Sequence, residues 1–365
     1  MIPELPGYLT QLGGGNHKGL IISLFTLMAG ISRPFSGKLT DTVGRVPVMI
    51  FGSLVCVVCS FSYTLLTTVA GFLFLRFLHG FSTGFKPTAT SAYGSDVVHE
   101  SRRAEALGAL AMGYTVGQSL GPVIGSYLAT HFSYNIMFYV SSAFAMGSVA
   151  ILYNIKETLK EPQKFKRHIL LIKRHEIFER SAIKPAVILL LLSFASGCVV
   201  TLAPDLSESV GLHNKGLFFA VYTVTSLMIR VLARKSADKY GRIPVLIVSS
   251  LTLAIAMFIL CEVHTEFMLL FGSAIFGLSW GMNGPTIAAW TVDLAAPEKR
   301  GRAVASMYIA LEAGIGIGAL VCADIYGNIT SNFVYAFALP ALLALVALFL
   351  LVMWWKKREV ALRNL

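Results

Sequence analysis

Four ionisable side chains interrupt long apolar stretches of this sequence: Arg76, His79, Lys86 and Glu312. A charge inside a bilayer is energetically costly, so such a residue usually faces a cavity or a partner. Glu312 lies in the segment YIALEAGIGIG, and loss of water favours the protonated form of a carboxyl group. We predict that Glu312 binds a proton or a cationic substrate. The alternative is a structural salt bridge to Arg76 or Arg33.

The three basic residues have helical spacing. Arg76 and His79 are one turn apart and share a helix face, and Lys86 lies near the same face. His79 is a candidate proton relay, with hydrogen-bonded packing as the alternative. Lys86 is a candidate cavity residue, but its ammonium group could instead snorkel to the membrane surface. Gln118 and Asn283 are predicted to line the same cavity.

The composition indicates what must position these side chains. Of 365 residues, 55% are hydrophobic and 13% charged, against about 25% charged in soluble domains. The apolar runs approach the roughly 20 residues that cross a bilayer, and they do not alternate as the strands of a β-barrel do. We predict an all-α polytopic membrane protein. The predicted spans are 17–37, 47–66, 69–93, 105–129, 133–154, 184–206, 213–234, 244–262, 265–290, 302–324 and 332–355.

The net charge of +11 follows the loops between these spans. Most Lys and Arg residues fall on one side of the predicted membrane, whereas Lys18 and Lys215 lie on the other. Basic loops face the cytoplasm, so the central linker and the C-terminus are expected there, and nucleic acid is not needed to explain the charge. The five cysteines lie within apolar spans, which favours helix packing over a metal site. No cofactor is indicated.

The sequence also repeats itself at an offset of 197 residues. The pattern R-x7-D-x2-GR-x-PV begins at Arg33 and again at Arg230, and other charged and glycine positions keep the same register. We therefore predict two homologous six-helix bundles of the same orientation, at 1–154 and 184–365, joined by a basic linker at 155–183. Met1 aligns with about residue 198, so the first half lacks the counterpart of residues 185–197, which is most of one span. Eleven complete spans and the end of a twelfth are expected.

Three glycine-containing motifs accompany the repeat. GKLTDTVGR carries Gly37, Asp41, Gly44 and Arg45, RFLHGFSTG carries Arg76, and GYTVGQSLGPVIGS carries Gly113, Gly117, Gly121, Pro122 and Gly125. With the two repeated bundles, these motifs resemble those of the major facilitator superfamily of secondary transporters. The second copy of the first motif has Arg234 in place of its first glycine, and Ser126 replaces the final glycine of the third.

The resemblance implies a role for the charged turn. Asp41 would lie by the start of helix 11, near Arg302, and Arg45 would pair with Asp96. We predict that these contacts form a cytoplasmic latch that holds an outward-open state. The alternative is that these charges only follow the membrane topology and have no role in gating. The other residues assigned to this gate are Gly37, Gly44, Arg103, Asp238, Gly241, Arg242 and Asp293.

The resemblance also implies proton coupling at Arg76 and export by exchange through the glycine motif. Gly113, Gly117 and Gly121 recur every four residues, so we predict a smooth face where another helix approaches closely. Pro122 is expected to loosen the helix there.

Together these patterns predict a proton-coupled efflux antiporter of a drug-like or sugar-like compound, as a monomer in a bacterial inner membrane. The alternatives are a proton symporter importing a small organic anion or sugar through Arg76 and Lys86, and a non-transporting membrane receptor. An enzyme is not indicated, because no metal-binding, nucleotide-binding or acidic catalytic motif occurs in the sequence.

Overall fold

The computed structural model describes residues 1–99, 103–172, 178–233, 236–296 and 300–363, and these contain helices, turns and loops without a strand. The α-helices are α1 (Leu5–Gln11), α2 (Lys18–Thr42), α3 (Arg45–Ser62), α4 (Val69–Asp96), α5 (Arg103–His131), α6 (Tyr134–Tyr153), α8 (Ile183–Ser209), α9 (Gly216–Leu232), α10 (Ser236–Lys239), α11 (Arg242–Cys261), α12 (Glu266–Leu294), α13 (Arg300–Tyr326) and α14 (Phe333–Arg363). Short 3-10 turns are η1 (Ile2–Glu4), η2 (Gly15–His17), η4 (Arg167–Leu170), η5 (Arg180–Ala182) and η7 (Thr330–Asn332).

Each predicted span coincides with one long helix. Within the described residues, eight helices are long and apolar enough to cross a membrane, which makes this a multi-pass membrane protein. The other three, α4, α5 and α9, do not meet the same requirement of length and hydropathy. α9 has 17 residues, and α4 contains the basic residues Arg76, His79 and Lys86. The count of eleven spans therefore stays a prediction.

Local sequence signals set the helix ends. Thr68 accepts a hydrogen bond from the backbone N–H of Gly71 before α4. Thr265, 197 residues later, caps α12 through Met268 in the same way. Such caps satisfy N–H groups that have no partner inside the helix. The repeat thus extends to the turns.

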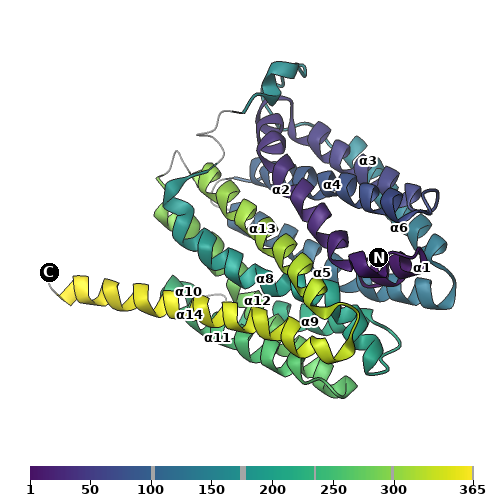
Figure 1. Ribbon diagram of the computed structural model, residues 1–365. Coiled ribbons are helices and arrows are strands. Elements are labelled where there is room, and N and C mark those ends of the chain that lie inside the picture. The colour runs from purple at the N-terminus through teal and green to yellow at the C-terminus, as the bar shows by residue number, and fades with distance from the viewer. Residues whose placement is uncertain (100–102, 173–177, 234–235, 297–299, 364–365) are drawn as a thin grey trace.

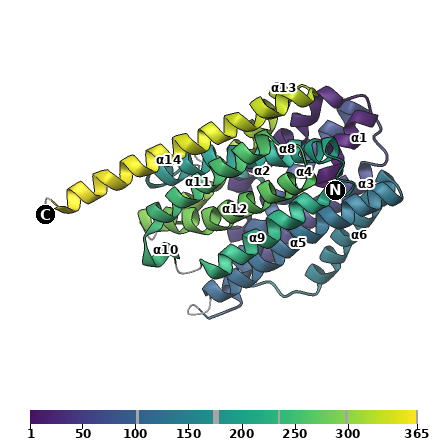
Figure 2. The same cartoon turned by 90° about the horizontal axis from the view of Figure 1, so that it is seen from below.

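The helices form two groups. α2, α3, α4 and α6 pack together, with α5 against α4 and α6, and α8, α9, α11, α12, α13 and α14 form the second group. In Figure 1 the first group lies at the upper right and the second at the lower left, and Figure 2 shows α5 beside α9. Contacts of α2 with α13 and of α5 with α9 join the groups. We call the end that carries residues 155–172 the linker end and the end that carries Gly15 and Asn328 the far end.

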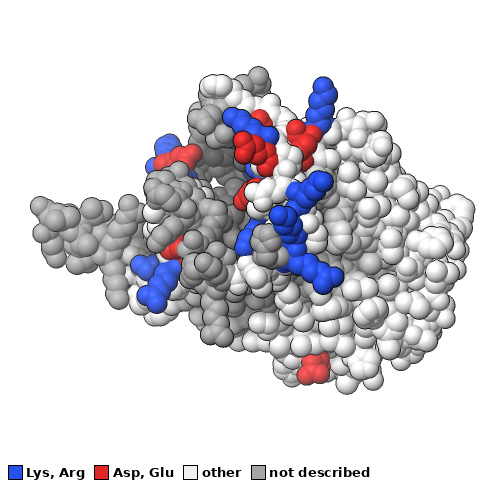
Figure 3. All heavy atoms as spheres, turned by 90° about the horizontal axis from the view of Figure 1, so that it is seen from above, with Lys and Arg blue, Asp and Glu red and all other residues white. Residues whose placement is uncertain are grey.

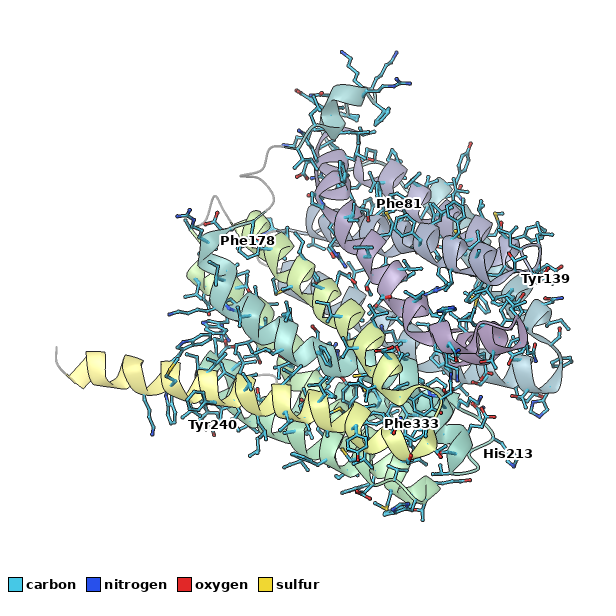
Figure 4. The ribbon with its side chains drawn as sticks, in the orientation of Figure 1. Phe81, Tyr139, Phe178, His213, Tyr240 and Phe333 are labelled. Carbon is cyan, nitrogen blue, oxygen red and sulfur yellow. The ribbon has the colours of Figure 1, made fainter. Side chains whose placement is uncertain are left out.

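Apolar packing is unevenly divided between the groups. The largest cluster of buried side chains lies in the second group, around α8, whereas the first group has two smaller clusters. In Figure 3 most of the coloured charged side chains gather in one part of the view, over the linker end, and the broad white area beside them carries almost none. Figure 4 places Phe178 and Tyr240 toward the linker end, and Tyr139, His213 and Phe333 toward the far end.

The far end is closed between the two groups. A Cβ added at Gly19 of α2 would lie 2.8 Å from the carbonyl oxygen of Ala319 in α13. One added at Gly216 of α9 would lie 2.6 Å from the carbonyl oxygen of Pro122 in α5. Only glycine allows backbones to approach this closely. These two crossings hold the groups together at one end.

Candidate substrate and proton site

An ion pair joins the two helix groups inside the protein. Arg33 of α2 donates through Nη2 to Oε1 of Glu312 in α13 at 2.6 Å, with side chains 10% and 7% exposed. The guanidinium also lies 4.5 Å from the ring centre of Tyr308. The buried carboxylate holds Arg33 inside the protein rather than at the membrane surface. Of the two partners proposed for Glu312, the structure brings it to Arg33.

The repeat places a second crossing opposite the first. At the repeat offset of 197 residues, Arg230 of α9 is the position equivalent to Arg33. Thr115 of α5 is likewise equivalent to Glu312. Arg230 indeed reaches Thr115, with Nη1 at 3.4 Å from the hydroxyl oxygen. Arg230 therefore turns toward the neighbouring helix, as Arg33 does. One crossing thus has a carboxylate, whereas the other has a hydroxyl.

Tyr114 lies between the two crossings. It is close enough to Glu312 and Arg33 to be affected by both charges, yet 61% of its surface is exposed. Its hydroxyl accepts a hydrogen bond from Gln118 at 2.8 Å. An exposed tyrosine next to a buried ion pair indicates an open space beside α5. Gln118 is exposed one turn along α5 from Tyr114, and its place in a substrate cavity stays a prediction.

Arg76 is held inside the first helix group. Its Nε donates to the carbonyl oxygen of Ile21 at 3.0 Å, and Nη1 lies 3.4 Å from the hydroxyl of Tyr63. His79 shares that hydroxyl through Nδ1 at 3.1 Å, and the Phe25 ring lies 4.5 Å from the guanidinium. Arg76 and His79 thus meet at one tyrosine. Their roles in proton coupling stay predictions.

Lys86 and Asn283 make no hydrogen bond to this cluster among the described residues. Lys86 donates to the hydroxyl of Ser148 in α6 at 2.8 Å. Asn283 is fully buried in α12, and neither its amide nitrogen nor its oxygen has a hydrogen-bond partner within the described residues. Neither residue joins Arg76 in a common site.

At the linker end, Arg45 organises the first charged turn. Its Nε donates to Asp96 at 3.0 Å, and Nη1 donates to the carbonyl oxygen of Thr40 at 2.5 Å and lies 3.3 Å from Asp41. Gly44 has a φ of 139°, which a side chain would strain. The sequence thus placed Arg45 beside Asp96. The expected contact of Asp41 is with the start of α13, near Arg302. It falls on side chains outside the described residues, as does the side chain of Arg103.

Sequence reasoning missed Glu157, which follows α6. Its carboxylate accepts from the backbone N–H groups of Arg45 at 3.1 Å and Val46 at 2.9 Å, so it caps α3 at the gate. Burial alone would raise the pKa of Glu157, but the backbone N–H donors outweigh it and hold the pKa below its usual value. Thr158 adds a hydrogen bond to Asp96 at 2.8 Å. The signal available in the sequence was a carboxylate a few residues after the end of a predicted span. From there it can reach the N-terminal end of a neighbouring helix.

The second charged turn repeats the first. Arg242 donates to Asp293 at 2.9 Å and to Asp238 at 2.5 Å. Gly241 has a φ of 92°. Gly37 faces open space. Both turns are therefore built inside their own helix group.

Ion pairs also mark the far end. Lys18 and Asp205 meet at 2.5 Å across the two groups, with side chains 12% and 10% exposed. Its repeat partner Lys215 pairs with Glu208 within the second group at 2.7 Å. The sequence placed Lys18 and Lys215 on one side of the predicted membrane, and the structure adds their carboxylate partners.

The glycine motif of α5 differs from expectation. A Cβ added at Gly113, Gly117 or Gly121 would meet no described heavy atom within 4 Å, so the predicted close helix contact along this face is wrong. Open space lies beside these glycines instead. The close approach is at Pro122, where α9 contacts the backbone.

The comparison with known families agrees with this arrangement. The sequence profile described as Major Facilitator Superfamily matches residues 1–203 and residues 185–364. The chain belongs to the major facilitator superfamily. The profile match covers both halves of the internal repeat.

Relatives and solved structures give the same result. The chain is 26% identical over 307 residues to the multi-drug resistance efflux pump PmrA of Streptococcus pneumoniae, covering 79% of this chain and 75% of the pump. It is 24% identical over 347 residues to the multidrug resistance protein MdtG of Klebsiella pneumoniae, covering 90% and 83%. The crystal structure of the peptide transporter POT in complex with sulfate superposes with a TM-score of 0.81 at 15% identity, covering 98% of this chain and 91% of that one.

Proposed function

We propose that this major facilitator protein is a proton-coupled efflux antiporter for drug-like compounds in a bacterial inner membrane. The ion pair between Arg33 and Glu312 carries the proposal, because it joins the two helix groups through a buried, protonatable group. The names of the sequence relatives, an efflux pump and a multidrug resistance protein, support export.

Arg33 acts in this mechanism as a built-in competitor for Glu312. A proton neutralises the carboxylate and releases the guanidinium, and a basic group of the substrate can replace Arg33 at the ionised carboxylate. Proton and substrate cation therefore exclude each other at one site, which is the requirement for exchange. Since the pair spans the two groups, its occupancy biases how they rock against each other.

The contacts at the two ends of the protein fit a state in which the far end is closed and the linker end is open. Lys18 and Asp205 cross the groups there, while Tyr114 borders open space. Asp41 is 74% exposed at the linker end. We propose that Asp41 docks at the start of α13 when the linker end closes, where the helix N-terminus favours a negative charge. The basic linker would then face the cytoplasm.

The symport alternative with Arg76 and Lys86 as the anion site has less support. Arg76 is 3% exposed and already bonded to a carbonyl oxygen. Lys86 is bonded to Ser148. Neither side chain is presented to a substrate in this state.

Proteoliposome flux with an imposed pH gradient tests the proposal. The substrate gradient should collapse the pH gradient in the wild type, and Glu312→Gln should lose this exchange by about a hundredfold, in line with loss of a proton-transfer group. Glu161→Gln, in the linker, is the charge-matched control. Flux that ignores the pH gradient would refute coupling, and absence of flux for every drug-like compound tested would favour a receptor.

A further inference from the structure

The two crossings between the helix groups are equivalent in position and unequal in charge. Arg33 and Arg230 occupy matching places in α2 and α9, and Glu312 and Thr115 occupy matching places in α13 and α5. The four residues therefore carry two positive charges and one negative charge. The surplus positive charge belongs to the crossing of Arg230.

The guanidinium of Arg230 uses little of its hydrogen-bonding capacity. Its described hydrogen bond is the long one to Thr115, at 3.4 Å. Its Nε is buried and has no partner within the described residues. Guanidinium groups offer five donors in a planar fork that fits a carboxylate. A buried donor without a partner is costly, so the Arg230 guanidinium has capacity left for a carboxylate acceptor.

The surroundings admit a ligand. Thr115 adjoins Tyr114, which is 61% exposed, and Tyr222 is close enough to both Arg230 and Tyr114 to be affected by each. Aromatic walls with one cation provide both apolar contact and orientation for an amphipathic acid.

We infer that Arg230 and Thr115 form an acid-binding subsite, so that the transported compound is a zwitterion. Its basic group replaces Arg33 at Glu312, and its acidic group binds Arg230. The inference rests on the proposed function for the first contact and adds the second. A purely cationic compound would leave Arg230 unpaired and would meet a net positive interface.

Rhodamine B and its ethyl ester test this subsite. They share one chromophore and one cationic group, and the ester masks the carboxylate. Wild-type protein in proteoliposomes should take up rhodamine B with a KM about tenfold below that of the ester, as expected for one charge-assisted hydrogen bond. Arg230→Gln should bring the ratio to about one, and Arg230→Lys should retain part of it.

Thr115→Glu provides the second variant. It supplies an internal carboxylate that matches Glu312 at the other crossing, so the chain should stay folded while the preference for rhodamine B disappears. Arg167→Gln, an exposed linker residue, removes the same charge and should keep the preference. Equal handling of the dyes by the wild type, including uptake of neither, would overturn the inference, as would a preference that survives Arg230→Gln.

The two proposals fail separately. Glu312→Gln should abolish gradient-driven uptake of both dyes but leave the difference in their Kd. If instead the dye preference depends on Arg230 while uptake ignores the pH gradient, the subsite stands and proton exchange is rejected.

Discussion

The two halves of the repeat keep one framework and place different chemistry on it. In the first half, Nε of Arg76 donates to the carbonyl oxygen of Ile21 at 3.0 Å. At the matching positions of the second half, the hydroxyl of Ser273 donates to the carbonyl oxygen of Phe218 at 2.6 Å. The same acceptor is therefore satisfied by a charged group in one half and by a neutral one in the other. The backbone contact is structural, and the charge is an addition.

The same division extends around Arg76. His79 and Tyr63 of the first half have Phe276 and Leu260 at the matching positions, and the large apolar cluster includes both of these. The first half thus has a polar network where the second has core. At the interface the relation reverses, because the carboxylate of Glu312 belongs to the second half. Each half contributes what the other lacks.

Arg76→Ser should have the largest effect of the changes that probe this comparison. Ser273 shows that a serine at this place reaches the backbone acceptor, so the variant should fold. Proton-coupled turnover should fall by about a hundredfold if the charge serves coupling. Proteoliposome exchange at equal protein content measures it.

Ser273→Ala is the matched control, and it should change turnover by less than about threefold, since it removes a neutral hydrogen bond. A fully active Arg76→Ser protein would show that the two halves differ only in packing.

The charged turns provide a second test. Arg45 is 14% exposed and its partner Asp96 is 29% exposed, whereas Arg242 and Asp293 are 25% and 51% exposed. Exposed ion pairs contribute little. Arg45→Ala should therefore slow transport by about tenfold, and Arg242→Ala by about threefold. Flux of one substrate through both variants makes the comparison, and a larger loss in Arg242→Ala would contradict it.

The far-end lysines form a third matched pair. Lys18 bridges the two helix groups to Asp205, whereas Lys215 stays within one group and its partner Glu208 is 71% exposed. Lys18→Met should open the far end and shift the population of states by about threefold, from a partly buried ion pair of about 0.7 kcal/mol. Lys215→Met should not shift it. Distances between spin labels across the far end report the populations, and equal shifts would remove the distinction.

Sequence reasoning reached the fold because the signals were local or repeated. Apolar run length predicted the helices, and the offset of 197 residues predicted which turns correspond. The pairing of Arg45 with Asp96 followed from the family motif. The crossings at Glu312 and Thr115 were missed as a set, because side chains far apart in sequence meet only through the packing of α2 on α13 and α5 on α9. The glycines of α5 misled for the same reason: period four indicates a smooth face without saying whether a helix covers it.

Glu157→Gln should have the smallest effect, and it tests a contact that the second half does not repeat, since Trp354 stands at the matching position. The folded pKa of Glu157 lies below its usual value. Its stabilising effect is therefore present above the unfolded pKa of about 4.3 and is lost as pH falls through the lower folded value. At pH 7 the variant should lose about 1 kcal/mol, as for a weakened helix cap. The Tm of detergent-solubilised protein measures the loss, which should shrink below about pH 4. A difference in Tm that persists unchanged at low pH would mean that the carboxylate charge does not stabilise the start of α3.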